Sequence, residues 1–277
     1  MTIKEWLKKA STALRAAGVA NPVLDAELIM LGALSVKEPQ LLPKTYLRTS
    51  GTEELPDALL DALEEMVWRR AQGEPVVYLT GHKDFFGRDF VVTDSVLIPR
   101  PETEQFIEIL KKLPLKEPKI LDIGTGSGVI GLTLALEIPG SKLTLTDVSA
   151  AALKIALKNA QRLGLSVKFI QSNLFASIKT KFDVICANLP YVDESWEGQP
   201  PELEFEPKKA LYAGDGGLAV YKKFLKNAPL HLVGAKLLLM EADKRQHKEL
   251  IELAEAQNFK HFATKGLILV FKLKDKE

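Results

Sequence analysis

Four consecutive residues, Asn188-Leu189-Pro190-Tyr191, carry groups that could bind and orient a planar amino or amide nitrogen. The Asn188 amide oxygen and the Leu189 backbone carbonyl are adjacent hydrogen-bond acceptors. Pro190 restricts the backbone, and Tyr191 offers a flat aromatic face. Two acceptors that take both hydrogens of an N–H₂ group would hold its nitrogen toward an electrophile without a strong base. Because Asn-x-Pro is also a common turn former, the place of this signature loop (residues 188–191) in the fold decides its interpretation.

A glycine-rich segment, residues 124–128, follows the apolar run 119–123 and is here called the glycine loop. Gly124, Gly126 and Gly128 lack a Cβ, so the loop can adopt positive φ angles and bring backbone amides close to a ligand. The helix predicted to follow would point its N-terminal N–H groups at the same place. Asp147 ends the next predicted strand, where related folds place an acid on ribose hydroxyls. The pattern predicts a nucleotide-like cofactor.

Apolar runs alternate with helical patterns over the rest of the chain, which predicts a mainly parallel sheet covered on both faces. The strands are expected at 119–123, 142–147, 167–171, 182–187 and 236–241, with an antiparallel closing pair at 259–262 and 267–273. The helices are expected at 128–138, 149–163, about 217–228 and 246–257. Ligands in such folds bind at the carboxyl ends of the strands. The loops after the first four strands should therefore form one site.

Residues 1–73 show helical periodicity, with helices expected over 6–17, 25–34 and 55–72. From residue 76 the period changes, and the segments 76–79, 84–86 and 90–92 predict short strands of a β-hairpin linker that covers residues 74–98. Two prolines that flank Arg100 forbid a helix at that residue, so this segment is expected to be extended and to form a pocket wall. A helix should begin at Pro101.

The composition indicates a reducing compartment and favours no particular partner. A net charge of +1 gives no support for nucleic-acid binding through bulk basicity. The single cysteine, Cys186, excludes a disulfide framework and lies in an apolar run, which predicts a buried thiol. No stretch reaches the length of a membrane span, and we expect a cytoplasmic protein. Three acids after the signature loop, Glu202, Glu204 and Glu206, are interpreted as loop charges.

Residues 122–128 resemble motif I of S-adenosylmethionine-dependent methyltransferases, and the signature loop resembles their amino-methylating signature, usually Asn-Pro-Pro-Tyr. The segment 98–104, with its Pro-Arg-Pro, and the segments 75–81 and 85–87 are similar to one branch, the PrmC/HemK family of peptide chain release factor glutamine methyltransferases. The resemblance extends from the first helices to about residue 257. It implies a Rossmann-like α/β fold with a seven-stranded methyltransferase sheet in residues 99–277, and a small helical domain for substrate recognition in residues 1–73, joined by the hairpin linker.

The resemblance implies methyl transfer from S-adenosyl-L-methionine to the side-chain amide nitrogen (N5) of the glutamine in the Gly-Gly-Gln motif of class 1 release factors. The residues implied to bind this cofactor are Gly124, Thr125, Gly126, Ser127, Gly128, Asp147, Asn173, Leu174 and Asn188. The residues implied to act in catalysis are Asn188, Leu189, Pro190 and Tyr191. We expect a monomer with the release factor as its protein substrate, and no metal, membrane or direct nucleic-acid partner.

The chain departs from the family pattern at Leu189, which replaces the first proline of the signature, and at Asn173, where an aspartate is usual. An adenine-N6 methyltransferase acting on RNA or DNA is the main alternative, since an adenine amino group fits the same acceptors. A dinucleotide-dependent oxidoreductase would use the G-x-G-x-x-G match that begins at Gly126, but it leaves the signature loop unexplained. A binding protein that has lost catalysis is a further alternative.

Overall fold

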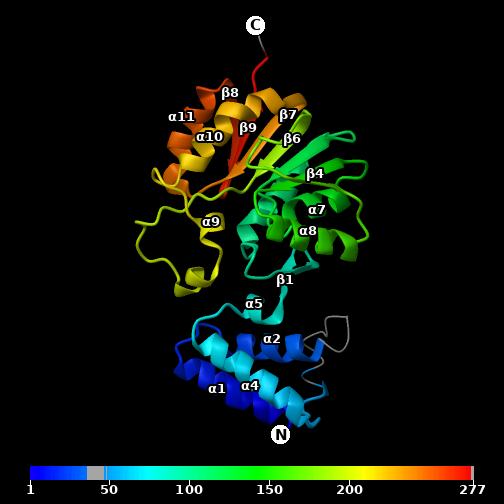
Figure 1. The fold of residues 1–277 in the computed structure, drawn as a ribbon, viewed down its shortest axis with the longest axis vertical. Coiled ribbons are helices and arrows are strands. Elements are labelled where there is room, and N and C mark those ends of the chain that lie inside the picture. Colours follow the sequence, from blue (N-terminus) through cyan, green and yellow to red (C-terminus); the bar gives the residue numbers. More distant parts are fainter. Residues whose placement is uncertain (36–46, 48, 276–277) are drawn as a thin grey trace. The chain divides into compact units, whose positions relative to one another are not determined.

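The computed structural model describes residues 1–35, 47 and 49–275, and the chain divides into two compact units (Figure 1). The first unit comprises Met1–His82 and the later segment Pro200–Phe205; the second comprises Lys83–Gln199 and Glu206–Glu277. The predicted linker, 74–98, is shared between the two units. The part of the predicted helical domain that falls on residues 36–46 and 48 lies outside the described residues. None of the described helices has the length and apolar character needed to cross a membrane.

The first unit is helical, as the sequence predicts. Its helices include α1 (Ile3–Ala16), α2 (Pro22–Ser35) and α4 (Asp57–Ala71). A capping box begins α1: the Thr2 hydroxyl accepts a hydrogen bond from the Glu5 backbone N–H, and the Glu5 carboxylate accepts one from Thr2. Trp6, Ala10 and Leu14 recur on one face of this helix and are buried in the core of the unit. The segment Pro200–Phe205, which forms η2 (Pro201–Phe205), joins this unit through an ion pair of Arg70 with Glu202.

The strand predicted at 76–79 is wrong, because this segment forms the short helix α5 (Val76–Thr80). Pro75 precedes the helix as its N-cap, and Gly81 ends it in the left-handed conformation at φ 75°. The Thr80 hydroxyl donates to the Val76 carbonyl one turn back. The β-branched run favoured a strand, but its apolar side chains pack on the helical core instead. The hairpin itself is confirmed: β1 (His82–Phe85) and β2 (Arg88–Val91) form a two-stranded sheet.

The second unit is built on one seven-stranded sheet in the order β5-β4-β3-β6-β7-β9-β8. The strands are β3 (Lys119–Ile123), β4 (Lys142–Asp147), β5 (Lys168–Gln171), β6 (Phe182–Ala187), β7 (Leu232–Glu241), β8 (Phe259–Lys265) and β9 (Ile268–Leu273). Neighbouring strands are parallel except that β9 is antiparallel to both β7 and β8. The predicted parallel sheet with its antiparallel closing pair is therefore confirmed. The strand order reverses between β3 and β6, where ligands of such sheets bind.

Helices cover both faces of this sheet, as the near-continuous apolar strands require (Figure 1). The helices are α6 (Gln105–Leu110), α7 (Val129–Glu137), α8 (Ala150–Arg162), α9 (Lys208–Leu211), α10 (Ala219–Asn227) and α11 (His247–Glu255), with the short turns η1 (Pro101–Glu104), η3 (Ala228–His231) and η4 (Lys244–Gln246). Along β6, Val184 and Cys186 pack toward α6, α7 and α8, whereas Ile185 and Ala187 pack toward α10 and α11. The predicted burial of the Cys186 thiol is confirmed.

Candidate active site

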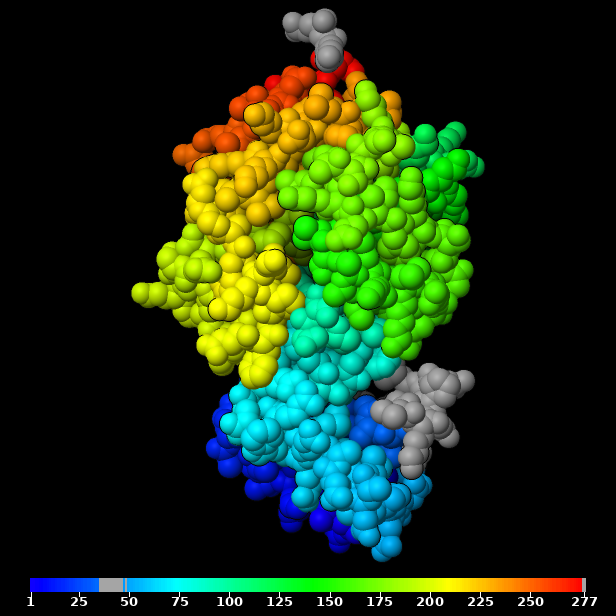
Figure 2. Space-filling view, viewed as in Figure 1, coloured from blue at the N-terminus to red at the C-terminus, as the bar shows by residue number. Residues whose placement is uncertain are grey.

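A cavity of about 430 Å³ opens at the carboxyl ends of β3, β4, β5 and β6. Figure 2 shows this part of the surface hollowed between the green segments of the second unit and the yellow segment near α9. Ten of the twelve residues assigned to cofactor binding or catalysis line the cavity: Gly124, Thr125, Gly126, Ser127, Asp147, Asn173, Leu174, Asn188, Leu189 and Pro190. Gly128 and Tyr191 are not among its lining residues. The volume lies in the range of small-molecule sites.

The glycine loop has the backbone conformation that its composition predicts. Gly124, Gly126 and Gly128 have φ values of 71°, 55° and 87°, which are unfavourable for residues with a Cβ. A Cβ at Gly126 would meet no atom within 4 Å, so this glycine borders open space. A Cβ at Gly128 would lie 2.8 Å from a Leu132 methyl carbon and 3.2 Å from the Ala156 Cβ. Gly128 therefore allows close packing of α7 and α8 and does not face the cavity.

Asp122, at the end of β3, holds the glycine loop from below, a role that the sequence analysis did not assign. Its Oδ2 accepts hydrogen bonds from the Thr125 hydroxyl at 2.5 Å and from the Gly131 N–H at 3.0 Å. Burial raises the pKa of Asp122 to about 6, and these two hydrogen bonds oppose the increase. The carboxyl group thus fixes both the loop and the first turn of α7.

Asp147 ends β4 beside the loop, and its carboxylate faces the cavity with both oxygens already oriented. Oδ2 accepts from the Gly126 N–H at 2.9 Å, and Oδ1 accepts from the Ser149 N–H at 2.8 Å. Each carboxylate oxygen has a second lone pair, so the group can still accept two ligand hydroxyls. Burial raises the pKa of Asp147, while the hydrogen bonds from Ser149 and Gly126 lower it.

The loop after β5, the strand next to β4, contributes Asn173 and Leu174 to the cavity lining. Asn173 is exposed, and Leu174 takes a positive φ of 49°. The Ser172 side chain stabilises this turn, since its hydroxyl donates to the Leu174 carbonyl at 2.7 Å and accepts from the Ser177 N–H at 3.0 Å. The turn presents one polar and one apolar side chain, a combination that suits the edge and the face of a planar ring.

The signature loop leaves the end of β6 and is anchored by Tyr221 of α10. The buried Tyr221 hydroxyl accepts from the Leu189 N–H at 3.3 Å, and its oxygen lies 3.2 Å from the backbone carbonyl oxygen of Ala187. The Leu189 side chain packs on the glycine loop, since a Cβ at Gly124 would lie 3.0 Å from its Cδ2. Leucine at this position therefore fills space between the two functional loops.

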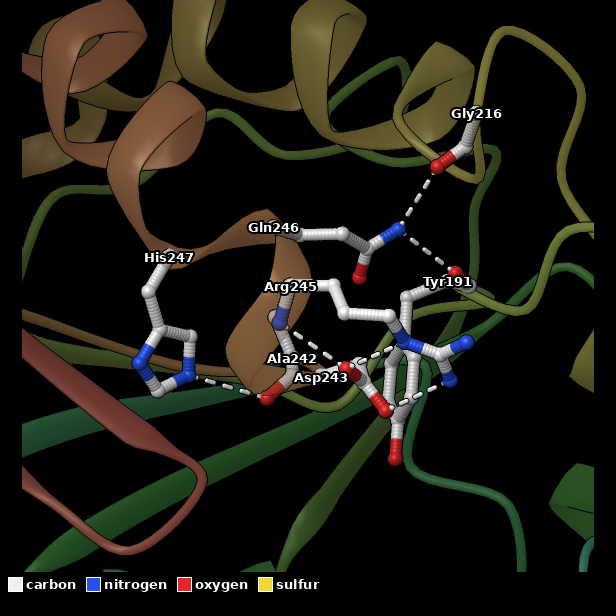
Figure 3. A network of polar contacts seen from close by, with 7 residues as sticks. All are labelled: Tyr191, Gly216, Ala242, Asp243, Arg245, Gln246 and His247. Carbon is white, nitrogen blue, oxygen red and sulfur yellow. Dashed lines mark hydrogen bonds and ion pairs between the residues drawn. The ribbon is translucent and has the colours of Figure 1, made fainter.

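Tyr191 does not line the cavity, and its backbone is held by a polar network (Figure 3). The Gln246 amide donates from Nε2 to the carbonyls of Tyr191 and Gly216, both at 2.8 Å. A Cβ at Gly217 would lie 2.0 Å from the Tyr191 carbonyl oxygen, so only glycine fits there. Below this network, Arg245 forms an ion pair with Asp243. The sequence analysis missed Gln246 because it lies 55 residues beyond Tyr191.

Thr103, which lines the cavity, and Glu241, which does not, lie next to Asn188, and the sequence analysis missed both. The Thr103 hydroxyl donates to Glu241 Oε2 at 2.8 Å, and Asn188 Nδ2 donates to the same hydroxyl at 3.4 Å. The Tyr191 hydroxyl donates to Glu241 Oε1 at 3.3 Å. Burial raises the pKa of Glu241, and hydrogen bonds from Thr103, Tyr191 and Asn188 lower it. The sequence did contain one signal for Glu241: like Asp147, it is an acidic residue at the end of an apolar predicted strand.

The Pro-Arg-Pro segment forms part of the cavity wall, as the sequence predicts: Pro99 and Arg100 line it. The Arg100 guanidinium pairs with the Glu206 carboxylate, which also accepts from the Ile98 N–H at 3.0 Å. Glu206 is only 4% exposed, so its interpretation as a loop charge is wrong. A buried carboxylate requires a partner, and it finds this partner 106 residues earlier in the chain.

Comparison with known proteins agrees with this geometry. Residues 5–81 match the family model described as the PrmC N-terminal domain, and residues 101–200 match the methyltransferase small domain. A release factor glutamine methyltransferase from Koribacter versatilis is 40% identical over 87% of this chain and 86% of its own length. A protein of the same name from Moorella thermoacetica is 38% identical over 92% of this chain and 90% of its own.

Solved structures support the fold of the second unit. A methyltransferase from Pyrococcus furiosus has a TM-score of 0.53 at 21% identity and covers 68% of this chain and 90% of its own. A ribosomal protein L11 methylase from Lactobacillus delbrueckii subsp. bulgaricus has a TM-score of 0.51 at 17% identity over 70% of this chain and 90% of its own. At these identities the likeness concerns the fold alone. The sequence relatives decide the family: this chain belongs to the release factor glutamine methyltransferases.

Proposed function

We propose that this protein transfers a methyl group from S-adenosyl-L-methionine to the side-chain amide nitrogen (N5) of the glutamine in the Gly-Gly-Gln motif of class 1 release factors. The observation that carries the proposal is the single cavity lined by both the glycine loop and the signature loop, in a chain of this family. We also propose that it acts as a cytoplasmic monomer and does not bind nucleic acid directly.

The cavity residues fit this cofactor. When bound, S-adenosyl-L-methionine supplies an electrophilic methyl group, and the protein supplies binding and orientation. The positive φ angles of Gly124 and Gly126 allow the loop backbone to approach the methionine part, and the free lone pairs of Asp147 suit two ribose hydroxyls. Asn173 and Leu174, which line the same cavity, would contact the adenine edge and face.

The signature loop would hold the substrate amide. Asn188 Oδ1 and the Leu189 carbonyl would accept the two hydrogens of the glutamine N–H₂, which leaves its nitrogen directed toward the cofactor methyl group. In this proposal the two acceptors orient the amide nitrogen, and the reaction requires no strong base. Pro190 would restrict the backbone of the loop, and the hydrogen bonds of Tyr191 with Glu241 and Gln246 would hold the loop in place.

The proposal is tested by methyl transfer from labelled S-adenosyl-L-methionine. Purified protein is incubated with a class 1 release factor, with its Gln→Ala variant in the Gly-Gly-Gln motif, and with ribosomal RNA. We expect label on the unmodified factor alone. Label on RNA would indicate an adenine methyltransferase instead. No label on either substrate, although the cofactor binds, would indicate a lost or redirected activity.

A further inference from the structure

Glu241 is a buried carboxylate that the proposed reaction does not use directly. It ends β7 and is 1% exposed. A carboxylate so deeply buried is costly unless hydrogen-bonded, and here hydroxyl groups surround it. Thr103 donates to one oxygen and Tyr191 to the other, while the hydroxyl of Tyr221 donates to the Glu241 backbone carbonyl at 2.5 Å. The side chain is thus held by Thr103 of η1 and Tyr191 of the signature loop, and the backbone by Tyr221 of α10.

The polarity of these hydrogen bonds determines how the Asn188 amide lies. The Thr103 hydroxyl has a single proton, and it donates this proton to Glu241 Oε2. The hydroxyl oxygen can then only accept, and it accepts from Asn188 Nδ2. A flipped amide would set the Asn188 oxygen against the lone pairs of the Thr103 hydroxyl oxygen.

We propose that Glu241 and Thr103 are positioning residues that fix the Asn188 amide with Nδ2 inward and Oδ1 toward the cavity. Only this orientation gives the cavity an acceptor, because a flipped amide would present a donor to the N–H₂ group of the substrate. The inference rests on the proposed function, in which Asn188 Oδ1 accepts a hydrogen from the glutamine amide. It adds two residues that act through Asn188 and lie 138 positions apart in the chain.

Kinetics of three variants test the inference in the full-length protein. Thr103→Val keeps the side-chain shape and removes the hydroxyl, and Glu241→Gln replaces one acceptor oxygen by a donor. Each should lower kcat about tenfold, the value of one net hydrogen bond in orienting the amide. The Kd of S-adenosyl-L-methionine, measured by calorimetry, should stay within about twofold of the parent value. Thr103→Ser keeps the hydroxyl and should restore the turnover that valine removes.

A double-mutant cycle separates positioning from a general structural defect. In an Asn188→Ala background, Glu241→Gln should cause no further loss of kcat, because its effect passes through the absent amide. Equal losses in the presence and absence of Asn188 would overturn the inference. Unchanged kcat in both Thr103→Val and Glu241→Gln would overturn it as well.

The orientation of the Asn188 amide can also be tested by NMR without any catalytic reaction, so that failure of the inference can be distinguished from failure of the proposed function. In ¹⁵N-labelled protein, the side-chain N–H₂ signals of Asn188 are those that disappear in Asn188→Ala. Both Thr103→Val and Glu241→Gln should shift these signals and speed their hydrogen exchange, and Thr103→Ser should restore them. Signals that keep the parent shift and exchange rate in both variants would refute the inference. A parent protein that methylates no release factor would refute the function alone.

Discussion

Replacement of Asp147 by alanine should weaken cofactor binding strongly. The carboxylate already accepts from Gly126 and Ser149, and each oxygen retains a lone pair toward the cavity. Hydrogen bonds to a charged group contribute about 1.5 to 3 kcal/mol each. Two such bonds to ribose hydroxyls, reduced by the water that they replace, give about 3 kcal/mol, on the order of 100-fold in Kd. Asp147→Asn keeps one acceptor and should lie between alanine and the parent.

Isothermal titration calorimetry with S-adenosyl-L-methionine measures this effect directly. Asp183 provides a matched control, because its carboxylate accepts from the Lys119 N–H at the amino end of β3, at the opposite edge of the sheet from the cavity. Asp183→Ala should leave the Kd within about twofold of the parent value. A Kd for Asp147→Ala within threefold of the parent would refute the assignment of this acid to the ribose.

Asn188→Ala should keep the parent Kd for the cofactor and lower the single-turnover rate roughly 100-fold, because it removes the orienting acceptor and leaves the glycine loop intact. A single-turnover rate equal to that of the parent would contradict the role of Asn188. Gly217→Ala should lower the free energy of unfolding by more than about 2 kcal/mol in urea titrations, since its Cβ would lie 2.0 Å from the Tyr191 carbonyl oxygen at φ 82°. Gly216→Ala, with open space at φ 64°, should cost only about 1 kcal/mol, and equal losses would contradict the packing argument. Folding raises the pKa of Asp122 from 3.8 to about 6. The free energy of unfolding therefore contains a contribution from this group that is complete below about pH 4 and falls by roughly 3 kcal/mol as the pH rises through 6. Asp122→Asn should remove this fall, and parallel curves of stability against pH for variant and parent would contradict the argument.

The sequence predicted those features that depend on local patterns. Apolar runs located the strands of the sheet, and their alternation with helices indicated parallel pairing. Gly124, Gly126 and Asp147 could be assigned to one cavity because the carboxyl ends of parallel strands share an edge of the sheet. The segment 76–79 was misassigned because β-branched residues favour strands. In the structure it forms a short helix, with Pro75 as its N-cap and Gly81 as its C-cap.

The features that the sequence did not predict depend on contacts between distant segments. Glu206 is buried because Arg100, far upstream, folds against it. Thr103 and Glu241 meet only when η1 and β7 pack around the end of β6, and no local pattern records that meeting. Gly128 was assigned to the cofactor with its neighbours, but its requirement for glycine comes from the close packing of α7 and α8.

The most direct test of the central claim locates the transferred methyl group. A class 1 release factor is incubated with this protein and S-adenosyl-L-methionine, digested, and sequenced by tandem mass spectrometry, with Asn188→Ala run in parallel. The account predicts one added methyl group on the side-chain nitrogen of the glutamine in the Gly-Gly-Gln motif, and almost none with the variant. A methyl group on another residue, or equal modification by the variant, would contradict it.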